Sequence, residues 1–141
     1  MKAFSYGIIP YLINDNGVSI MLSKSSNKSD YGFVKGKIDS GETPKECATR
    51  EVFEEIGVKI DIEDLESLVT QKNPKKDVGV FFINYQKYLD REINLATDEL
   101  YSVEWFNISD LPKINKNQRL ILTDIFVKFN KLDFYQRKRN D

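Results

Sequence analysis

Residues 36–58 read GKIDSGETPKECATREVFEEIGV, a glycine-bounded loop that leads into the strongest helix signal of the chain. Thr43 is a favourable N-cap, proline suits the first helical position, and Glu46 stands three residues after the cap, where a capping box requires it. Gly57 supplies the left-handed residue at which helices commonly end. The sequence therefore predicts a helix over Pro44–Ile56.

The side chains of this helix divide into an apolar face and an acidic face, because successive residues turn by about 100°. The apolar stripe that we expect to pack on a core contains Ala48, Val52, Phe53 and Ile56. Glu51, Glu54 and Glu55 share an arc of roughly 100° beside that stripe. Three neighbouring carboxylates repel one another unless water or a cation separates them. A solvated acidic surface and a cation site are both compatible with the helix alone.

The composition limits the class of protein. The chain has 141 residues, of which 40% are hydrophobic and 30% charged, with a net formal charge of −1. This length suits one domain, and the apolar fraction is too high for a disordered chain. No apolar run approaches the roughly 20 residues that span a bilayer, and no N-terminal signal is recognisable, so we expect no membrane association and a cytoplasmic location.

The chain contains no histidine and one cysteine, Cys47. Ser-His-Asp triads, histidine phosphotransfer and His-ligated zinc are therefore excluded, as are an internal disulfide and a cysteine-rich metal site. Catalysis must rely on carboxylates, Lys, Arg, Tyr, Ser or Thr, or on a hard metal ion held by oxygen ligands.

Strand-forming runs flank the quoted stretch on both sides. Strands are predicted over Ser5–Ile13, Val18–Ser23, Leu65–Thr70, Val78–Leu89 and Val103–Phe106. Turns or loops are predicted over Asn14–Gly17, Lys24–Asp30 and Asn73–Asp77. A helical turn over Ile108–Pro112 and an amphipathic helix over Asn117–Leu132 close the domain, and the basic tail from about residue 136 is expected to fray.

The loop before the acidic helix carries Lys35 and Lys37 on either side of Gly36. A glycine-rich loop lets backbone groups approach a ligand closely, and lysines supply positive charge for phosphate groups. Carboxylate ligands for a divalent cation next to these lysines suit a polyphosphate that binds together with Mg²⁺ or Mn²⁺.

The quoted stretch resembles the signature of the Nudix hydrolase family, G-x5-E-x7-R-E-U-x-E-E-x-G-U, in which U is a bulky aliphatic residue. All nine specified positions match over 23 residues, namely Gly36, Glu42, Arg50, Glu51, Val52, Glu54, Glu55, Gly57 and Val58. The resemblance implies an α+β fold, the α/β/α sandwich of that family with a mixed β-sheet between helices, formed by a single domain over residues 1–141.

The resemblance also implies roles for the matching positions. Glu51, Glu54 and Glu55 become ligands of Mg²⁺ or Mn²⁺, joined by the backbone carbonyl of Lys35. Arg50 is expected to orient the ligand carboxylates by ion pairs and is counted with the catalytic residues.

Glu42 is expected to support these groups from outside the ligand set. The implied reaction is hydrolysis of a phosphoanhydride, in which a carboxylate accepts the proton of the attacking water. Members of the family take this base from the signature or from a later loop, so Glu54, Glu55 and Glu99 are the catalytic candidates.

The identity of the substrate stays open among several subfamilies. Residues 31–38 resemble a stretch of messenger-RNA decapping members, residues 36–44 equally resemble MutT-type triphosphate pyrophosphohydrolases, and the size and lysines suit diadenosine polyphosphate hydrolases. We expect a nucleotide or nucleoside polyphosphate, or an RNA 5′ end, and a monomer or homodimer. A Nudix-fold module that binds a nucleotide without cleaving it is the non-enzymatic alternative. Residues expected to contact the substrate are Tyr31, Phe33, Lys35, Gly36 and Lys37.

Overall fold

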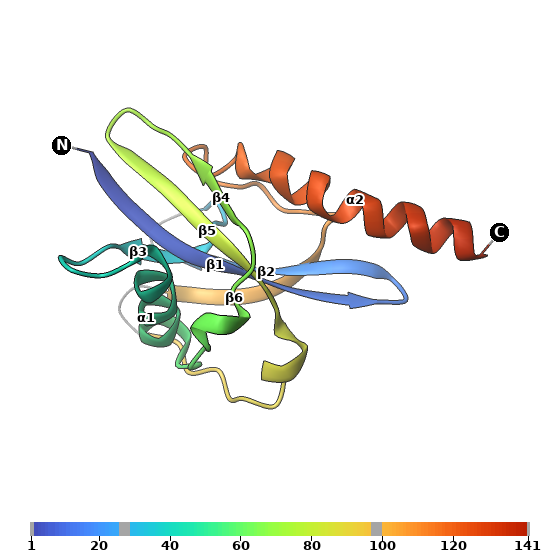
Figure 1. The fold of residues 1–141 in the computed structure, drawn as a ribbon, viewed down its shortest axis with the longest axis horizontal. Coiled ribbons are helices and arrows are strands. Elements are labelled where there is room, and N and C mark those ends of the chain that lie inside the picture. The colour runs from blue at the N-terminus through green and yellow to red at the C-terminus, as the bar shows by residue number, and fades with distance from the viewer. Residues whose placement is uncertain (1, 26–28, 97–99, 141) are drawn as a thin grey trace.

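The computed structural model describes residues 2–25, 29–96 and 100–140, which form one mixed β-sheet with a helix on each face (Figure 1). The elements follow in the order β1 (Ala3–Asn14), β2 (Gly17–Ser25), β3 (Val34–Lys37), α1 (Pro44–Ile56), η1 (Ile62–Asp64), β4 (Leu68–Gln71), β5 (Lys76–Asn84), η2 (Tyr85–Tyr88), β6 (Leu100–Asn107) and α2 (Ile121–Asn140). The expected α+β class and the mixed sheet between helices are confirmed.

The strands are ordered β4-β5-β1-β2-β6, and β3 lies off this path beside β1. β1 pairs in parallel with β5, whereas its pairs with β2 and β3 are antiparallel. Along one edge of β1, residues 5–8 pair with β3 and residues 11–14 pair with β2. β2 and β3 therefore diverge from the same strand, and we call the space between them the fork. One bridge spans it, where Ser23 and Gly32 exchange N–H···O bonds of 2.8 Å.

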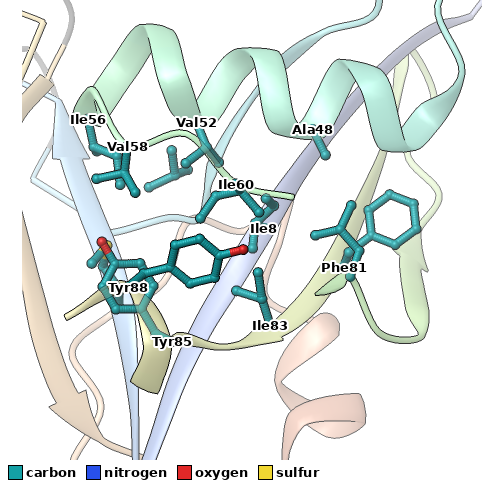
Figure 2. Close-up of a cluster of buried hydrophobic side chains, with 13 residues drawn as sticks. Ile8, Ala48, Val52, Ile56, Val58, Ile60, Phe81, Ile83, Tyr85 and Tyr88 are labelled. Carbon is teal, nitrogen blue, oxygen red and sulfur yellow. The ribbon is translucent and has the colours of Figure 1, made fainter. Parts of the chain in front are cut away.

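Alternating side chains of the central strands enter two separate cores, as the pleat of a strand requires. Ile8 of β1 lies in the core beneath α1, together with Val52 and Ile56 of that helix (Figure 2). Ile9, the next residue, lies in the core on the opposite face. There it packs with residues that include Ile121, Ile125 and Phe129 of α2. The same sheet is thus buried on both faces.

The structure differs from several of the boundaries predicted from the sequence; the strand predicted over Leu65–Thr70, for example, begins at Leu68. The strand predicted over Val78–Leu89 ends at Asn84, and Tyr85–Tyr88 forms a 3-10 turn because both tyrosines pack into the core beneath α1. β3 was not predicted as a strand. α2 begins at Ile121 rather than Asn117 and ends at Asn140 rather than Leu132. The expected fraying of the basic tail stays a prediction.

A further difference concerns the buried face of α1. Phe53 was expected to widen the apolar stripe, yet 54% of its surface is exposed, whereas Glu55 is only 8% exposed. The buried face of α1 is therefore turned toward the carboxylates. Within the described ranges, neither helix has the length and apolar composition that a membrane span requires.

Candidate active site

Local sequence fixes the helix that carries the acidic residues. The hydroxyl of Thr43 accepts a hydrogen bond from the backbone N–H of Glu46, and the Glu46 carboxylate accepts one from the N–H of Thr43. Gly57 ends the helix with φ 74°, in the left-handed region that glycine tolerates. The predicted helix over Pro44–Ile56, its capping box and its glycine stop are all confirmed.

Arg50 lies at the centre of the acidic cluster. Its guanidinium bonds Glu42 at 2.6 and 3.0 Å, Glu51 at 2.9 Å and Glu54 at 3.1 Å. A further N–H donates to the backbone carbonyl of Lys37 at 2.9 Å. One cation thus pairs with these three carboxylates, and with Asp39 at 3.4 Å, and ties the helix to the end of β3. The ion pairs that the sequence led us to expect for Arg50 are present, and its catalytic role stays a prediction.

These contacts determine how Glu42 titrates. Hydrogen bonds from Arg50, reinforced by the backbone N–H of Asp39 at 2.8 Å, hold the pKa of the Glu42 carboxyl below its ordinary value. The same pairing, with Glu42 as its largest contributor, raises the pKa of Arg50 further above its ordinary value. Glu42 is therefore ionised at neutral pH and anchors Arg50. Its supporting role around a bound cation stays a prediction.

Gly36 is required because Glu51 occupies the space where a side chain would stand. A Cβ built on Gly36 would lie 2.0 Å from the carboxyl carbon of Glu51 and 2.1 and 2.3 Å from its oxygens. This glycine therefore serves the close approach of helix and strand. Its role in direct substrate contact stays a prediction.

The backbone of β3 fixes the direction of Lys35. The N–H of Ile38 donates to the carbonyl of Phe4 at 3.0 Å, and bonding pairs alternate along an antiparallel ladder. The carbonyl of Lys35 therefore points away from β1. Because Val34 and Gly36 face α1, the side chain of Lys35 points to the opposite face of the sheet.

Glu55 and Lys35 lie on the walls of one cavity at the fork. Both line a cavity of about 100 Å³, the fork cavity, whose other walls include Ser23, Tyr31 and Gln118. With 8% of its surface exposed, Glu55 is the most buried of the three helix carboxylates. The site therefore combines a buried carboxylate and a lysine in one space, while Arg50 engages the remaining two carboxylates. In the described part of the chain, no three acidic or cysteine side chains are grouped as a metal site in this conformation.

The two aromatic residues predicted to contact substrate differ in their surroundings. Tyr31 lines the fork cavity, donates its hydroxyl hydrogen to Glu104 at 2.9 Å, and packs edge-on against Phe106 with ring centroids 5.0 Å apart. The bond to Glu104 is the main cause that raises the pKa of Tyr31. Phe33 also lines the fork cavity, but it is only 3% exposed and packs in the core beneath α2. Its contact with substrate stays a prediction.

Two further expectations concern Lys37 and Glu99. Lys37 is exposed at the end of β3 and is not among the residues that line the fork cavity. Glu99 lies outside the described residues, so its role as general base stays a prediction.

Two other hollows adjoin the signature. A groove of about 730 Å³ follows the outer side of α1 near Phe53 and Ile62, and none of the three helix carboxylates lines it. A second cavity, of about 370 Å³, shares Lys35, Asn115 and Gln118 with the fork cavity. From the sequence, Asn73–Asp77 was predicted as a turn, and its lysines were compared with a loop of diadenosine polyphosphate hydrolases. The cavity that Lys75 and Lys76 line was not predicted.

Comparison with known proteins identifies the family of the chain. The NUDIX domain profile matches residues 3–125. The chain belongs to the Nudix hydrolase family.

Among curated relatives, the chain is similar to the mRNA decapping complex subunit 2 of Schizosaccharomyces pombe, with 36% identity over 99 residues, which are 64% of this chain and 12% of that protein. It is also similar to the NAD-capped RNA hydrolase NudC of Pseudomonas fluorescens, with 28% identity over 115 residues, which are 79% of this chain and 41% of that protein. The chain thus matches less than half the length of either relative.

Among solved structures, a MutT NUDIX hydrolase from Burkholderia pseudomallei superposes with a TM-score of 0.67 at 20% identity. The match covers 87% of this chain and 97% of that structure, and it supports the fold.

Proposed function

We propose that the chain hydrolyses a phosphoanhydride bond in a nucleoside polyphosphate with the help of Mg²⁺ or Mn²⁺. The substrate is a dinucleoside polyphosphate such as diadenosine tetraphosphate, or the capped or triphosphorylated 5′ end of an RNA. The observation that carries the proposal is the fork cavity, in which the buried carboxylate of Glu55 and the side chain of Lys35 line the same space. The names of the decapping subunit and of the NAD-capped RNA hydrolase support this substrate class.

A divalent cation fits the donor set on the acidic side of α1. Glu51, Glu54 and Glu55 supply carboxylate oxygens, which are the ligands that Mg²⁺ prefers in proteins. The missing side chain of Gly36 leaves the carboxylate of Glu51 close to β3. Because Arg50 bonds Glu51 and Glu54 in this conformation, we expect the cation to compete with Arg50 for these two groups.

The groups in and near the fork have different proposed roles in the reaction. When bound, the cation supplies charge neutralisation for phosphate oxygens and a water of lowered pKa. Lys35 provides a second positive charge toward phosphate, and its carbonyl, which points away from β1, is the proposed backbone oxygen ligand of the cation. Arg50 and Glu42 keep α1 in register with the end of β3, so that these groups hold their positions.

Glu99 is the proposed general base, and Glu54 or Glu55 is the alternative. The chain is attached on both sides of residues 97–99: the N–H of Ala96 donates to the carbonyl of Glu55 at 2.9 Å, and Leu100 pairs with Ser25. Glu99 stands three positions after Ala96 and one before Leu100 in the sequence, and this sequence position is what supports it as the base. A carboxylate free of metal is also a better base than one that binds it.

Two alternatives remain for the finer function. A MutT-type nucleoside triphosphate pyrophosphatase would use the same residues on a shorter phosphate chain. A non-catalytic nucleotide-binding module would bind without turnover. The cytoplasmic location and the monomeric or homodimeric state stay predictions.

A substrate panel tests the proposal directly. Wild-type protein with Mg²⁺ is incubated with diadenosine tetraphosphate, nucleoside triphosphates, ADP-ribose and capped RNA, and the products are separated by chromatography. We expect turnover of the long polyphosphates or capped RNA to exceed that of ADP-ribose. Absence of turnover on every substrate with Mg²⁺ and with Mn²⁺ would favour the binding module.

Glu55→Gln tests the carboxylate that carries the proposal, and Glu63→Gln, on the exposed η1 turn, is its matched control. We expect kcat to fall by roughly two to four orders of magnitude in Glu55→Gln and to stay unchanged in Glu63→Gln. Mg²⁺ should raise the Tm of the wild-type protein and of Glu63→Gln more than that of Glu55→Gln, since ligand binding stabilises the folded state. Equal Mg²⁺ shifts in all three proteins would contradict the metal assignment.

A further inference from the structure

The hollow on the outer side of α1, which we call the α1 groove, exposes large apolar side chains. It has a volume of about 730 Å³ and lies between α1 and residues 59–63. Phe53 is 54% exposed and Ile62 is 40% exposed, and both line the groove together with the buried Ile60. Exposed apolar side chains gathered in one hollow are typical of a surface that binds a protein segment.

The rim of the α1 groove carries more negative than positive charge. Its acidic residues are Glu46, Asp61 and Glu63, and its basic residues are Arg50 and Lys59. Arg50 is already paired, at 2.6–3.4 Å, with four carboxylates that do not line the groove. Asp61 lies 3.8 Å from the ammonium group of an exposed lysine, a pairing that contributes little, and Glu63 has no ion-pair partner among the side chains that the structure describes. The groove therefore favours a positively charged occupant.

The C-terminal part of α2 has the complementary composition. Residues 131–140, which we call the α2 end segment, read KLDFYQRKRN, with four basic residues, one acidic residue and three large apolar or aromatic residues. α2 continues through this segment to Asn140. Ten helical residues are about 15 Å long, whereas the 13 residues of α1 are about 20 Å long, so the segment can lie along α1.

A chain does not place this segment in its own groove. α1 and α2 pack on opposite faces of the sheet. The C-terminal end of α2 and the helix α1 lie toward opposite ends of the longest axis of the molecule (Figure 1). Ile121, Ile125 and Phe129 hold α2 on its own face, since all three are 0% exposed. The segment that reaches the groove therefore belongs to another copy.

We propose that the α1 groove binds the α2 end segment of a second copy of this chain. The contact pairs the positive charge of the segment with Asp61 and Glu63, and it covers Phe53 and Ile62 with apolar side chains. Repeated by a two-fold axis, the contact occurs twice and closes a dimer. The inference goes beyond the proposed function and does not depend on hydrolysis.

An exchange of charge between the two surfaces tests the contact in the full-length protein. The groove variant carries Asp61→Lys and Glu63→Lys, and the segment variant carries Arg137→Glu, Lys138→Glu and Arg139→Glu. Sedimentation equilibrium over a wide range of protein concentration gives the Kd of the dimer for the wild type, for each variant and for their equimolar mixture.

Each variant alone should dimerise at least about tenfold more weakly than the wild type, because like charges then meet at the contact. The mixture should dimerise with a Kd close to that of the wild type, since the reversed segment meets the reversed groove and the two unchanged surfaces meet each other. Added salt should weaken the wild-type dimer, because it screens charges near the surface. Phe53→Ser, which changes no charge, should weaken the dimer as well.

Asp15→Lys/Asp110→Lys is the matched control, because it changes the net charge as the groove variant does, at exposed positions outside the groove. Its Kd should change less than about twofold. All substitutions in the groove and in the control are at exposed positions, so we expect the Tm of these proteins to match that of the wild type.

Three results would overturn the proposal. Variants that dimerise like the wild type would place the dimer contact on another surface. Variants that are weakened but do not recover in the mixture would show that the groove and the segment do not contact each other. If the wild type stays monomeric but binds an isolated peptide with the sequence of residues 131–140, the groove takes a basic segment of another protein, and the second copy is the wrong occupant.

Discussion

Replacing Gly36 by alanine is the most direct test of how the strand and the acidic helix fit together. The added Cβ would stand 2.0 Å from the carboxyl carbon of Glu51, whereas ordinary van der Waals contact begins near 3.4 Å. Glu51 must therefore move by about 1.4 Å. That movement breaks its 2.9 Å bond to Arg50 and forces the side chain from its rotamer.

The expected cost follows from those two losses. A partly buried, charge-assisted hydrogen bond contributes about 1–2 kcal/mol, and an off-rotamer side chain costs about 0.5–1.5 kcal/mol. We expect Gly36→Ala to lower the free energy of unfolding by about 2–3 kcal/mol, as measured by urea denaturation at pH 7. Turnover should fall as well, because Glu51 is displaced from the acidic cluster.

A double-mutant cycle isolates the cause. In a Glu51→Ala background the obstacle is absent, so Gly36→Ala should cost about 1 kcal/mol or less, giving an interaction energy of roughly 2 kcal/mol. Gly41→Ala is the control. Gly41 has φ 84° and no neighbouring atom within 4 Å, so its cost should be the same in both backgrounds. A full cost for Gly36→Ala in the absence of the Glu51 side chain would refute the close-approach explanation.

Three other perturbations have defined outcomes. Burial raises the pKa of the Cys47 thiol to about 11. The native protein should therefore react with iodoacetamide at pH 8 far more slowly than the unfolded chain does. Rapid labelling of the native protein would contradict the burial of this thiol. Gln118→Met leaves the buried N–H of Phe33 without its acceptor and should cost about 1–3 kcal/mol in urea denaturation, whereas a cost below about 0.5 kcal/mol would show that water replaces the side chain. Arg50 holds the pKa of Glu42 below its ordinary value near 4.5, so the stability that ionised Glu42 contributes is complete above that pH and lost as the pH falls through the lowered pKa. The stability difference between wild type and Glu42→Gln should therefore shrink as the pH is lowered from 5 toward 3, and a constant difference would argue against the ion pair as its source.

Local features of the sequence were sufficient for the helix and the hairpin. The helix over Pro44–Ile56 was predicted residue for residue, because its cap, its proline and its glycine stop act within one turn of the chain. The Asn14–Gly17 turn was likewise predicted, since residues 14 and 17 pair across it. The family followed from the same stretch, because the spacing of its acidic residues is itself local.

Boundaries that depend on distant contacts were less predictable. Tyr85 and Tyr88 read as the end of a strand, yet both are drawn into the core beneath α1 and form a 3-10 turn. The sequence predicted that Phe53 packs on the core, and it predicted the same surroundings for Glu55 as for Glu51 and Glu54. Which flank of α1 is buried depends on where β2 and β3 diverge, and the sequence of the helix does not specify the position of these strands.

The sequence by itself determined the chemistry that this protein has at its disposal: carboxylates on one helix, an arginine among them, lysines in the preceding loop, and no histidine. Only the tertiary structure decided how these groups are distributed. In the folded protein, Glu51 and Glu54 accept hydrogen bonds from Arg50, and Glu55 lines the fork cavity together with Lys35. Lys75 and Lys116, which are distant in sequence, line the second cavity. The physical reason is that helix caps and turns are stabilised by neighbours in sequence, whereas a cavity is defined by segments that meet only after the sheet has formed.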